Sequence, residues 1–150
     1  MNNPFLLSSI NRLEYWKKFR KNISDFSDEQ KICEVVKYWS NAPLLNIAYN
    51  YDEPSTWPTI WEMIEKNDWC RNSIAIGMDS TLRLCGFNES RLTLGTIIDY
   101  NNSIMQMVVK IDNSYILNYD WNTITVYSSV KCRWLKKFKW SMKHYVEVYD

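Results

Sequence analysis

The chain has 150 residues, of which 46% are hydrophobic and 15% aromatic, and its formal net charge is +1. This length predicts a single domain, residues 1–150, with a real core, and the composition excludes low-complexity disorder. A nearly neutral charge gives no general argument for binding nucleic acid or a membrane, and the longest apolar runs are too short to span a bilayer.

Two helices are predicted at the beginning of the chain. Ser8 or Ser9 is placed to cap a first helix that runs to about Asn22. Ser27 and Gln30 have the spacing of a capping box and open a second helix. Four apolar residues of that helix follow at helical spacing and predict one buried stripe: Ile32, Val35, Val36 and Trp39.

An irregular connection and a short helix are predicted next. Residues 40–57 contain Pro43 and Pro54 and are expected to form the connection. Pro58 suits the first turn of a short helix that continues to Lys66.

The helix that follows is the central element of the prediction. Asp68 is a good N-cap, which places Cys70 in the first turn, and Gly86 is expected just after the last turn. Three small residues on this helix form a seam that permits close approach of a neighbour: Ser73, Gly77 and Ser80.

The remainder of the chain is predicted to be mostly β structure. Three strands separated by short turns are expected in an antiparallel meander: Leu92–Tyr100, Ile104–Ile111 and Tyr115–Tyr119. Ile124–Tyr127 is predicted to add a strand, and the segment from Lys131 to Val148 fits either a strand or a helix. The fold class is therefore α+β, with N-terminal helices and a central cysteine-bearing helix packed on a C-terminal antiparallel sheet.

The sequence predicts neither a metal nor a cofactor. No two of the four cysteines form a C-x-x-C pair, so a zinc site is not expected and free thiols are the simplest interpretation. The chain has only three glycines, which build no phosphate-cradling loop and no dinucleotide fingerprint.

Cys70 is the candidate nucleophile. A thiol at the beginning of a helix feels the positive end of the helix dipole and lies beside free backbone N–H groups. Those groups favour the thiolate and can form part of an oxyanion hole. The alternative is that Cys70 is a small, half-buried packing residue, as free cysteines commonly are.

Three stretches around this cysteine carry an ordered pattern: Trp57–Ile64, Asp68–Ile76 and Leu82–Phe87. They combine a tryptophan-and-proline entry with a glutamate, an acidic residue before the cysteine, and a glycine that closes the helix. This pattern resembles the transglutaminase-like cysteine proteinases of bacteria and phages, over roughly residues 50 to 120. The resemblance implies a papain-like fold, in which a central helix packs on an antiparallel sheet, and it implies that Cys70 is the nucleophile.

The resemblance also implies a histidine that opens a later strand and then an aspartate. The histidine is expected near Ser103–Gln106, but the one histidine of the chain is His144, close to the C-terminus. The aspartate is expected near Leu117–Asp120, where Asn118 or Asp120 could stand in. The glycine that usually lies beside the nucleophile is also absent.

Without this histidine, the site lacks the side chain that would transfer protons. Acyl transfer needs a proton delivered to the leaving amine, and positioned acid–base groups typically contribute about 10²–10⁴-fold to the rate. The amides of Gln106 and Asn118 cannot exchange protons near neutral pH.

We therefore expect a catalytically degenerate transglutaminase-like domain that acts as an interaction or assembly module with a protein partner. The first alternative is an active thiol hydrolase or acyltransferase that uses Cys70, and the second is a small nucleic-acid-binding protein. The richness in Asn, Ile, Lys and Tyr fits an AT-rich, viral genome, which suggests a phage or viral particle component. No basic segment precedes the apolar run Phe5–Leu7, so no signal peptide is expected, and the expected location is the host cytosol or a virion.

Two groups of aromatic residues are further candidates for binding. Trp57, Trp61 and Trp69 are expected near the site entry, where they could line a ligand groove together with Gln106, the alternative being core packing of the tryptophans. The tail interleaves cations with aromatic residues that could grip nucleic acid: Lys131, Arg133, Lys136, Lys137, Lys139 and Lys143 with Trp134, Phe138, Trp140 and Tyr145. The alternative for the tail is one solvated basic face and one buried aromatic face.

Overall fold

The computed structural model describes residues 3–45 and 53–149, and within them the chain forms four α-helices and one six-stranded sheet. The helices are α1 (Ser9–Ile23), α2 (Asp28–Trp39), α3 (Ile60–Lys66) and α4 (Arg71–Leu84). The strands are β1 (Leu92–Asp99), β2 (Met105–Ile111), β3 (Tyr115–Leu117), β4 (Ile124–Val126), β5 (Cys132–Ser141) and β6 (His144–Val148). Four 3₁₀ turns complete the described elements: η1 (Pro4–Leu6), η2 (Pro54–Thr56), η3 (Glu89–Arg91) and η4 (Tyr127–Ser129).

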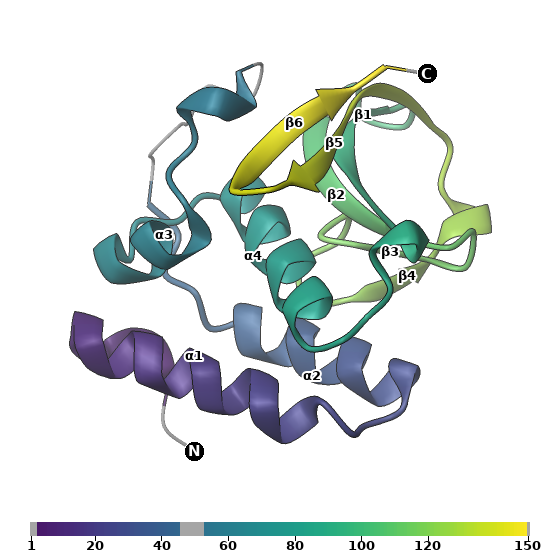
Figure 1. Ribbon diagram of the computed structural model, residues 1–150. Helices are drawn as coiled ribbons and strands as arrows, with labels where there is room; N and C mark the ends of the chain where they lie inside the picture. Colours follow the sequence, from purple (N-terminus) through teal and green to yellow (C-terminus); the bar gives the residue numbers. More distant parts are fainter. Residues whose placement is uncertain (1–2, 46–52, 150) are drawn as a thin grey trace.

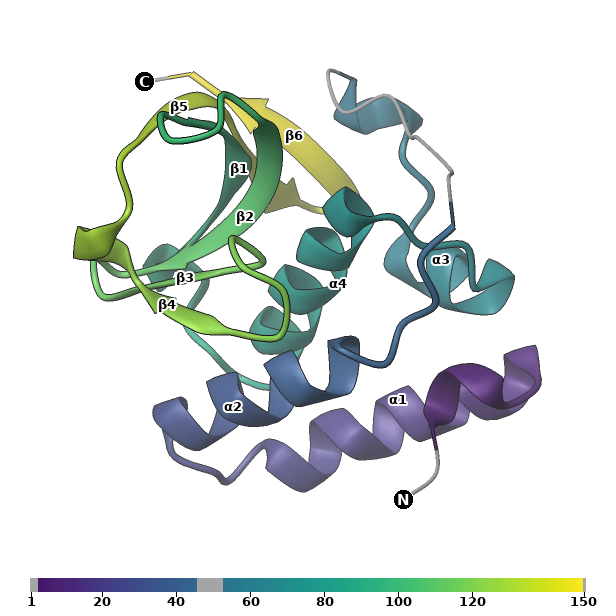
Figure 2. The same cartoon turned by 180° about the vertical axis from the view of Figure 1, so that it is seen from behind.

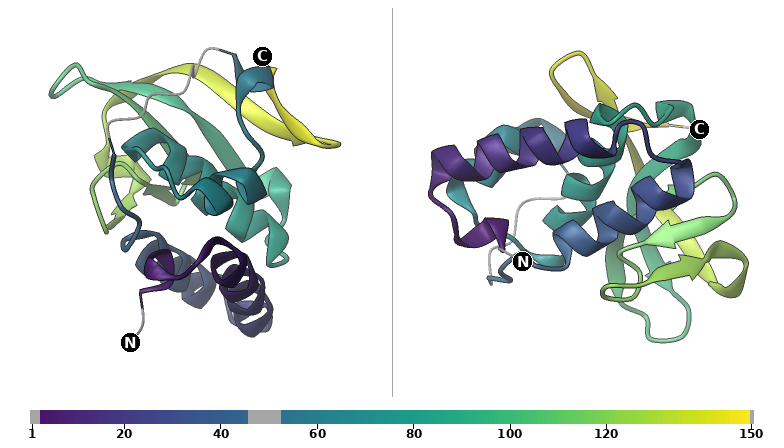
Figure 3. Two further views of the ribbon diagram at one scale, coloured as in Figure 1. Left: turned by 90° about the vertical axis from the view of Figure 1, so that its left-hand side faces the viewer. Right: turned by 90° about the horizontal axis from the view of Figure 1, so that it is seen from below.

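Helix α4 lies in the middle of the molecule, between the sheet and the other helices (Figures 1 and 2). It contacts β1 and β2 on one side and α2 and α3 on the other. Seen from below, α1 and α2 lie side by side in the foreground and form the outer layer (Figure 3). This arrangement confirms the predicted α+β class with a central helix packed on an antiparallel sheet.

The sheet is antiparallel throughout, with the strand order β4-β3-β2-β1-β5-β6. The tail that fitted either a helix or a strand forms β5 and β6, which extend the sheet beyond β1. The main core, which includes Leu94, Met107 and Val109, lies on the face that α4 covers. A smaller cluster on the opposite face contains Ile97 and Val108.

The first connection between strands is longer than predicted, and the second has the predicted bounds. Residues 100–104 join β1 to β2, and residues 112–114 join β2 to β3. Ser103 and Asp112 adopt positive φ angles of 58° and 51° in these turns, and Asn118 ends β3 with a φ of 64°. Short polar side chains therefore occupy left-handed positions that glycine more often takes, in a chain with only three glycines.

The contact between α2 and α4 depends on two small residues of α4: Gly77, which belongs to the predicted seam, and Thr81, which does not. A Cβ atom at Gly77 would lie 2.6 Å from Cη2 of the Trp39 ring, so only glycine allows this approach. The buried Thr81 Oγ1 accepts hydrogen bonds from Nε1 of Trp39 at 3.0 Å and of Trp16 at 3.1 Å. It donates to the carbonyl oxygen of Gly77 at 2.7 Å, so one hydroxyl satisfies both buried indoles.

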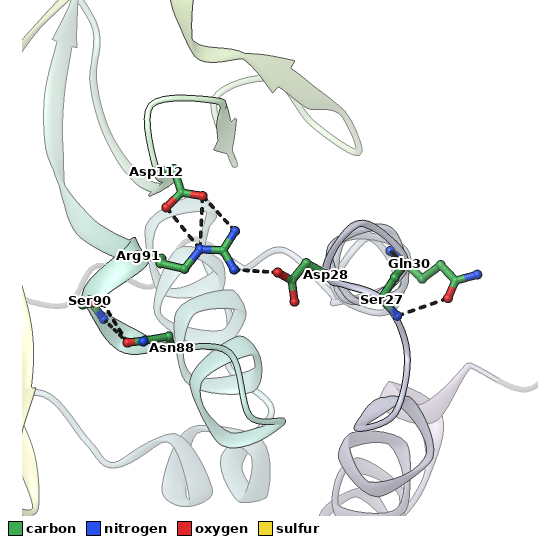
Figure 4. A network of polar contacts seen from close by, with 7 residues as sticks. All are labelled: Ser27, Asp28, Gln30, Asn88, Ser90, Arg91 and Asp112. Carbon is green, nitrogen blue, oxygen red and sulfur yellow. Dashed lines mark hydrogen bonds and ion pairs between the residues drawn. The ribbon is translucent and has the colours of Figure 1, made fainter.

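The turn before β1 is tied to α2 by an exposed arginine (Figure 4). Arg91 Nη1 lies 2.5 Å from Oδ2 of Asp28, the first residue of α2, and Nη2 lies 2.8 Å from Oδ2 of Asp112. The Arg91 guanidinium holds the pKa of Asp112 below its usual value. All three side chains are well exposed, so we expect the network to orient the turn relative to α2 and to add little to the free energy of unfolding.

Candidate functional site

Cys70 is the N-cap of α4 and not a residue of its first turn, so the prediction that Asp68 caps the helix was wrong. The reason is that the chain before Cys70 is extended. Trp69 forms a parallel bridge with Leu44, and its carbonyl oxygen accepts a hydrogen bond of 2.7 Å from the Leu45 N–H. Asn67 ends α3 in the left-handed conformation, with a φ of 59°. The thiol still lies at the positive end of α4, because an N-cap residue flanks the unpaired N–H groups of the first turn.

Ser73 holds the backbone of Cys70 against this helix end. Its Oγ accepts a hydrogen bond of 2.9 Å from the Cys70 N–H and donates one of 3.1 Å to the Cys70 carbonyl oxygen. The Cys70 Sγ lies 3.6 Å from the same hydroxyl oxygen. Ser73 is fully buried and Cys70 only partly, so the sulfur lies at the edge of the core.

β2 and the end of β3 meet the same end of α4. Asn72 Oδ1 accepts a hydrogen bond of 3.1 Å from the Met107 N–H. Asn118 Nδ2 donates to the carbonyl oxygens of Arg71 at 2.6 Å and of Met107 at 3.0 Å. Two carbonyl acceptors fix the orientation of the amide, since only its NH₂ group can donate to both. The candidate Asn118 is therefore brought beside the Cys70 end of α4, where it joins the helix to the sheet.

The candidate Gln106 lies on the other face of the sheet from α4. Side chains alternate along β2, with Met107 in the main core and Val108 in the cluster on the opposite face, so Gln106 shares the face of Val108. Its Nε2 donates to the carbonyl oxygen of Tyr119 at 3.0 Å. The residue of β2 that shares the helix-facing side and precedes Met107 is Met105, which is 49% exposed.

His144 lies in the strand at the far edge of the sheet. It belongs to β6, which is separated from β2 by β1 and β5. At a strand spacing of about 4.8 Å, three steps across the sheet place β6 roughly 14 Å from the strand that meets the Cys70 end of α4. His144 is exposed and lines a small hollow with Trp57 and Pro58.

Asp120 is an exposed residue of the loop between β3 and β4. Its carbonyl oxygen accepts a hydrogen bond of 3.2 Å from Thr123 N, which closes a turn in this loop. Of the two candidates for the aspartate position, Asn118 is the one whose side chain contacts α4.

The three candidate tryptophans lie in separate surroundings and do not line one groove. Trp69 is fully buried and contacts the ring of Trp39 at 4.8 Å between centroids. Trp57 packs on Phe138, with 4.9 Å between centroids, and Trp61 contacts the ring of Trp16 at 6.1 Å. These contacts favour core packing over ligand binding for Trp57 and Trp69, whereas Trp61 is 41% exposed.

The aromatic residues of the basic tail pack within the protein. Phe138 and Tyr145 are buried on the face that α4 covers, and Trp140 contacts Tyr145 there. Trp134 lies on the opposite face and donates through Nε1 to the Tyr127 hydroxyl at 3.0 Å. Aromatic side chains therefore occur on both faces of β5, and the predicted division into one basic and one aromatic face was wrong.

Two residues beside the site were missed by the sequence analysis. The Arg71 guanidinium lies 5.1 Å above the ring of Trp121. This contact joins the first residue of α4 to the loop after β3. Arg71 directly follows Cys70 and Trp121 directly follows Asp120, the two positions that the family pattern marks. That adjacency is a signal in the sequence, but it does not say that the two side chains meet.

The described part of the chain holds no group of three or more His, Cys, Asp or Glu side chains arranged to bind a metal ion. None of its helices has both the length and the apolar character that crossing a bilayer requires. The four cysteines form no disulfide with one another.

The fold is similar to that of solved structures of one bacterial protein. LapG from Legionella pneumophila superimposes with a TM-score of 0.73 and 14% identity, over 87% of this chain and 76% of LapG. The EGTA-treated form gives a TM-score of 0.73 and 14% identity over 87% and 74%, and the calcium-bound form gives 0.68 and 14% over 83% and 72%. No protein-family model and no curated protein matches the chain. The chain therefore has the fold of LapG, and this agrees with the papain-like fold that the sequence resemblance implies.

Proposed function

We propose that this protein is a transglutaminase-like domain without the ordinary catalysis of that family, and that it acts as an interaction or assembly module for a protein partner. The observation that carries the proposal is the identity of the residues that meet the Cys70 end of α4. The strand that the family pattern provides with a histidine offers Met105 and Met107 on its helix-facing side. Neither side chain transfers protons.

The role of Asn118 supports the same proposal. In the family pattern this region supplies an aspartate, whose charge would orient a histidine. Here the amide hydrogens of Asn118 are committed to the carbonyl oxygens of Arg71 and Met107, so the group fastens the helix to the sheet. Asn118 therefore has a structural task, and its neutral amide supplies no negative charge that would orient a histidine.

LapG is a bacterial transglutaminase-like cysteine protease, and the main alternative is that this chain shares such an activity through Cys70. At 14% identity the likeness concerns the fold alone. The alternative needs a base other than a histidine of β2, because the single histidine of the chain belongs to β6.

Activity assays with a matched pair of variants test the proposal. Wild type, Cys70→Ala and Cys33→Ala are screened for peptidase, amidase and transamidase turnover, with Cys33 as an exposed reference thiol. We expect equal background rates for all three proteins. Turnover that disappears in Cys70→Ala and persists in Cys33→Ala would overturn the proposal.

A peptide-display selection on the wild-type protein tests the binding role. We expect enriched peptides to bind Cys70→Ala as well as wild type and to lose affinity for Trp121→Ala, because Trp121 and Arg71 form the surface beside the site. Trp61→Ala is the control, since Trp61 is exposed beside α1 instead. Peptides that bind all of these proteins equally would place the interaction surface elsewhere.

We further propose a phage or viral particle, or the host cytosol, as the setting of this module. The basis is the richness in Asn, Ile, Lys and Tyr and the occurrence of the resembled family in phages. Mass spectrometry of purified particles from an infected culture tests this setting. If the chain is absent from the particles, the proposal that it is a virion component is wrong.

A further inference from the structure

A cleft opens at the other end of α4, where the sheet divides between β1 and β5. The pairing of these strands ends at Leu94 opposite Phe138. Beyond that point, Leu92 pairs only with β2 and Trp140 only with β6. The cleft between them has a volume of about 390 Å³, within the range of small-molecule sites, and Arg83 of α4 lines it. We call it the Arg83 cleft.

Two of the three guanidinium nitrogen atoms of Arg83 have no hydrogen-bond partner among the described residues. Its Nε and Nη2 atoms are shielded from solvent, and neither has an acceptor. The guanidinium is held in place by the ring of Trp140, whose centroid lies 4.5 Å from Cζ. A partly buried guanidinium without an acceptor is costly, because the water it has lost is not replaced.

The nearest carboxyl group does not satisfy this arginine. Asp79 lies one turn before Arg83 on α4, and its Oδ2 accepts a hydrogen bond of 2.5 Å from the Tyr145 hydroxyl. Arg83 influences Asp79 only through its charge, which tends to lower the pKa of that carboxyl. The Nε and Nη2 donors are therefore unpaired behind the wall of the cleft, and a small movement of the guanidinium would present them to an acceptor that enters it.

The walls of the cleft indicate what else such a ligand carries. Leu92, Phe138 and Trp140 supply an apolar and aromatic lining. Asp79 and Glu89 also line the cleft, so a ligand with two negative charges would meet repulsion as well as attraction. Lys137 and Lys139 line the cleft as well, so its three cationic and two acidic side chains leave a formal charge of +1, which a single carboxylate offsets. A carboxylate also fits the planar donor array of the Arg83 guanidinium.

We propose that the Arg83 cleft binds a small monocarboxylate with an aromatic or aliphatic body, whose carboxylate accepts hydrogen bonds from Arg83. The site lies at the C-terminal end of α4, whereas Cys70 lies at its N-terminal end. It is therefore separate from the candidate site described above, and it does not depend on whether Cys70 is reactive.

Phenylacetate is the probe for the first test. Its binding is measured by changes in the amide chemical shifts in NMR spectra of the full chain. We expect saturable shifts for residues that line the cleft, at concentrations up to about 10 mM. The uncharged phenylacetamide has nearly the same shape, and we expect it to bind at least about tenfold more weakly because it lacks the charge that pairs with Arg83. This comparison needs no variant and so does not depend on how a variant folds.

Variants test the arginine itself. Arg83→Gln is expected to weaken phenylacetate binding at least about tenfold. Arg20→Gln is the matched control, because Arg20 also lies over a tryptophan, 4.1 Å from the Trp16 ring, and also has a shielded Nε without an acceptor, but does not line the cleft. The proposal is overturned by equal binding of phenylacetate and phenylacetamide, by unchanged binding in Arg83→Gln, by tighter binding of phenyl phosphate, or by the absence of saturable shifts.

Discussion

Asn118 Nδ2 donates a hydrogen bond of 2.6 Å to the carbonyl oxygen of Arg71, which joins the residue after β3 to the first residue of α4. The same amide reaches the carbonyl oxygen of Met107 in β2 at 3.0 Å. One side chain thus connects three elements at the end of the helix that carries Cys70. This relationship fixes the helix end relative to the sheet, and it leads to the first prediction.

Asn118→Ala is expected to destabilise the protein by about 2–4 kcal/mol, because two buried carbonyl oxygens lose their donor and alanine must adopt a positive φ. The free energy of unfolding in urea measures this. Asn122→Ala is the control, since Asn122 has a similar φ of 62° but is exposed. If both variants lose the same small amount, the backbone conformation and not the amide is what Asn118 contributes.

Thr81→Val should cost about 2–4 kcal/mol, since the indole N–H groups of Trp16 and Trp39 would be buried without an acceptor. Thr81→Ser is the matched variant, because it keeps the hydroxyl and removes one methyl group, with an expected cost of about 1 kcal/mol. Urea unfolding of the two variants distinguishes them. A larger loss in Thr81→Ser would show that packing dominates at this position.

Gly77→Ala is expected to destabilise the protein by about 1–3 kcal/mol, the usual cost of overpacking a core. This is expected even though alanine is more favourable than glycine in a helix by about 1 kcal/mol. The new Cβ would lie 2.6 Å from the Trp39 ring, and that fully buried ring has little room to move. Thermal unfolding measures the effect. Asn22→Ala, at an exposed position of α1, is the control for helix propensity and should be neutral or stabilising. An increase in Tm for Gly77→Ala would contradict the close approach of α2 and α4.

Asp79 should make stability depend on pH. Burial raises its pKa from 3.8 to about 6, while the Tyr145 hydroxyl and Arg83 act to lower it and Glu89 acts to raise it. The folded state therefore binds this proton more tightly than the unfolded state. The favourable contribution is fully present below pH 3.8 and is lost as the pH rises to about 6. The two pKa values differ by about 2, which at 1.36 kcal/mol per unit corresponds to about 3 kcal/mol.

Asp79→Asn removes this titration and keeps an oxygen that can accept from Tyr145. We expect the stability of the variant relative to wild type to increase between pH 4 and pH 7, by up to about 3 kcal/mol. Urea unfolding at several pH values measures the difference, with Asp25→Asn as an exposed control. A difference that stays constant across this range would show that Asp79 does not titrate as its burial implies.

Local patterns predicted most of the elements. The capping box at Ser27 and Gln30 is present, and the apolar stripe that follows it is buried. The strands were predicted close to their bounds, because an alternating pattern with polar turns depends on neighbours in the chain. The beginning of α4 was predicted wrongly, because Trp69 takes an extended conformation to pair with Leu44, a contact that local propensity does not contain.

The sequence by itself determined the α+β class, the central helix with Cys70 at its beginning, and the lack of a histidine in the strands that follow it. The histidine is lacking only where the family pattern places one, near Ser103–Gln106, because His144 belongs to the later strand β6. These properties depend on residue identity and on periodicities within single elements. Only the tertiary structure decided that Asn118 fastens α4 to the sheet, that Gln106 faces away from the helix, and that Arg83 lines a cleft without an acceptor. These depend on which strand face a side chain occupies and on how far neighbouring strands stay paired, and both are set by packing between distant segments.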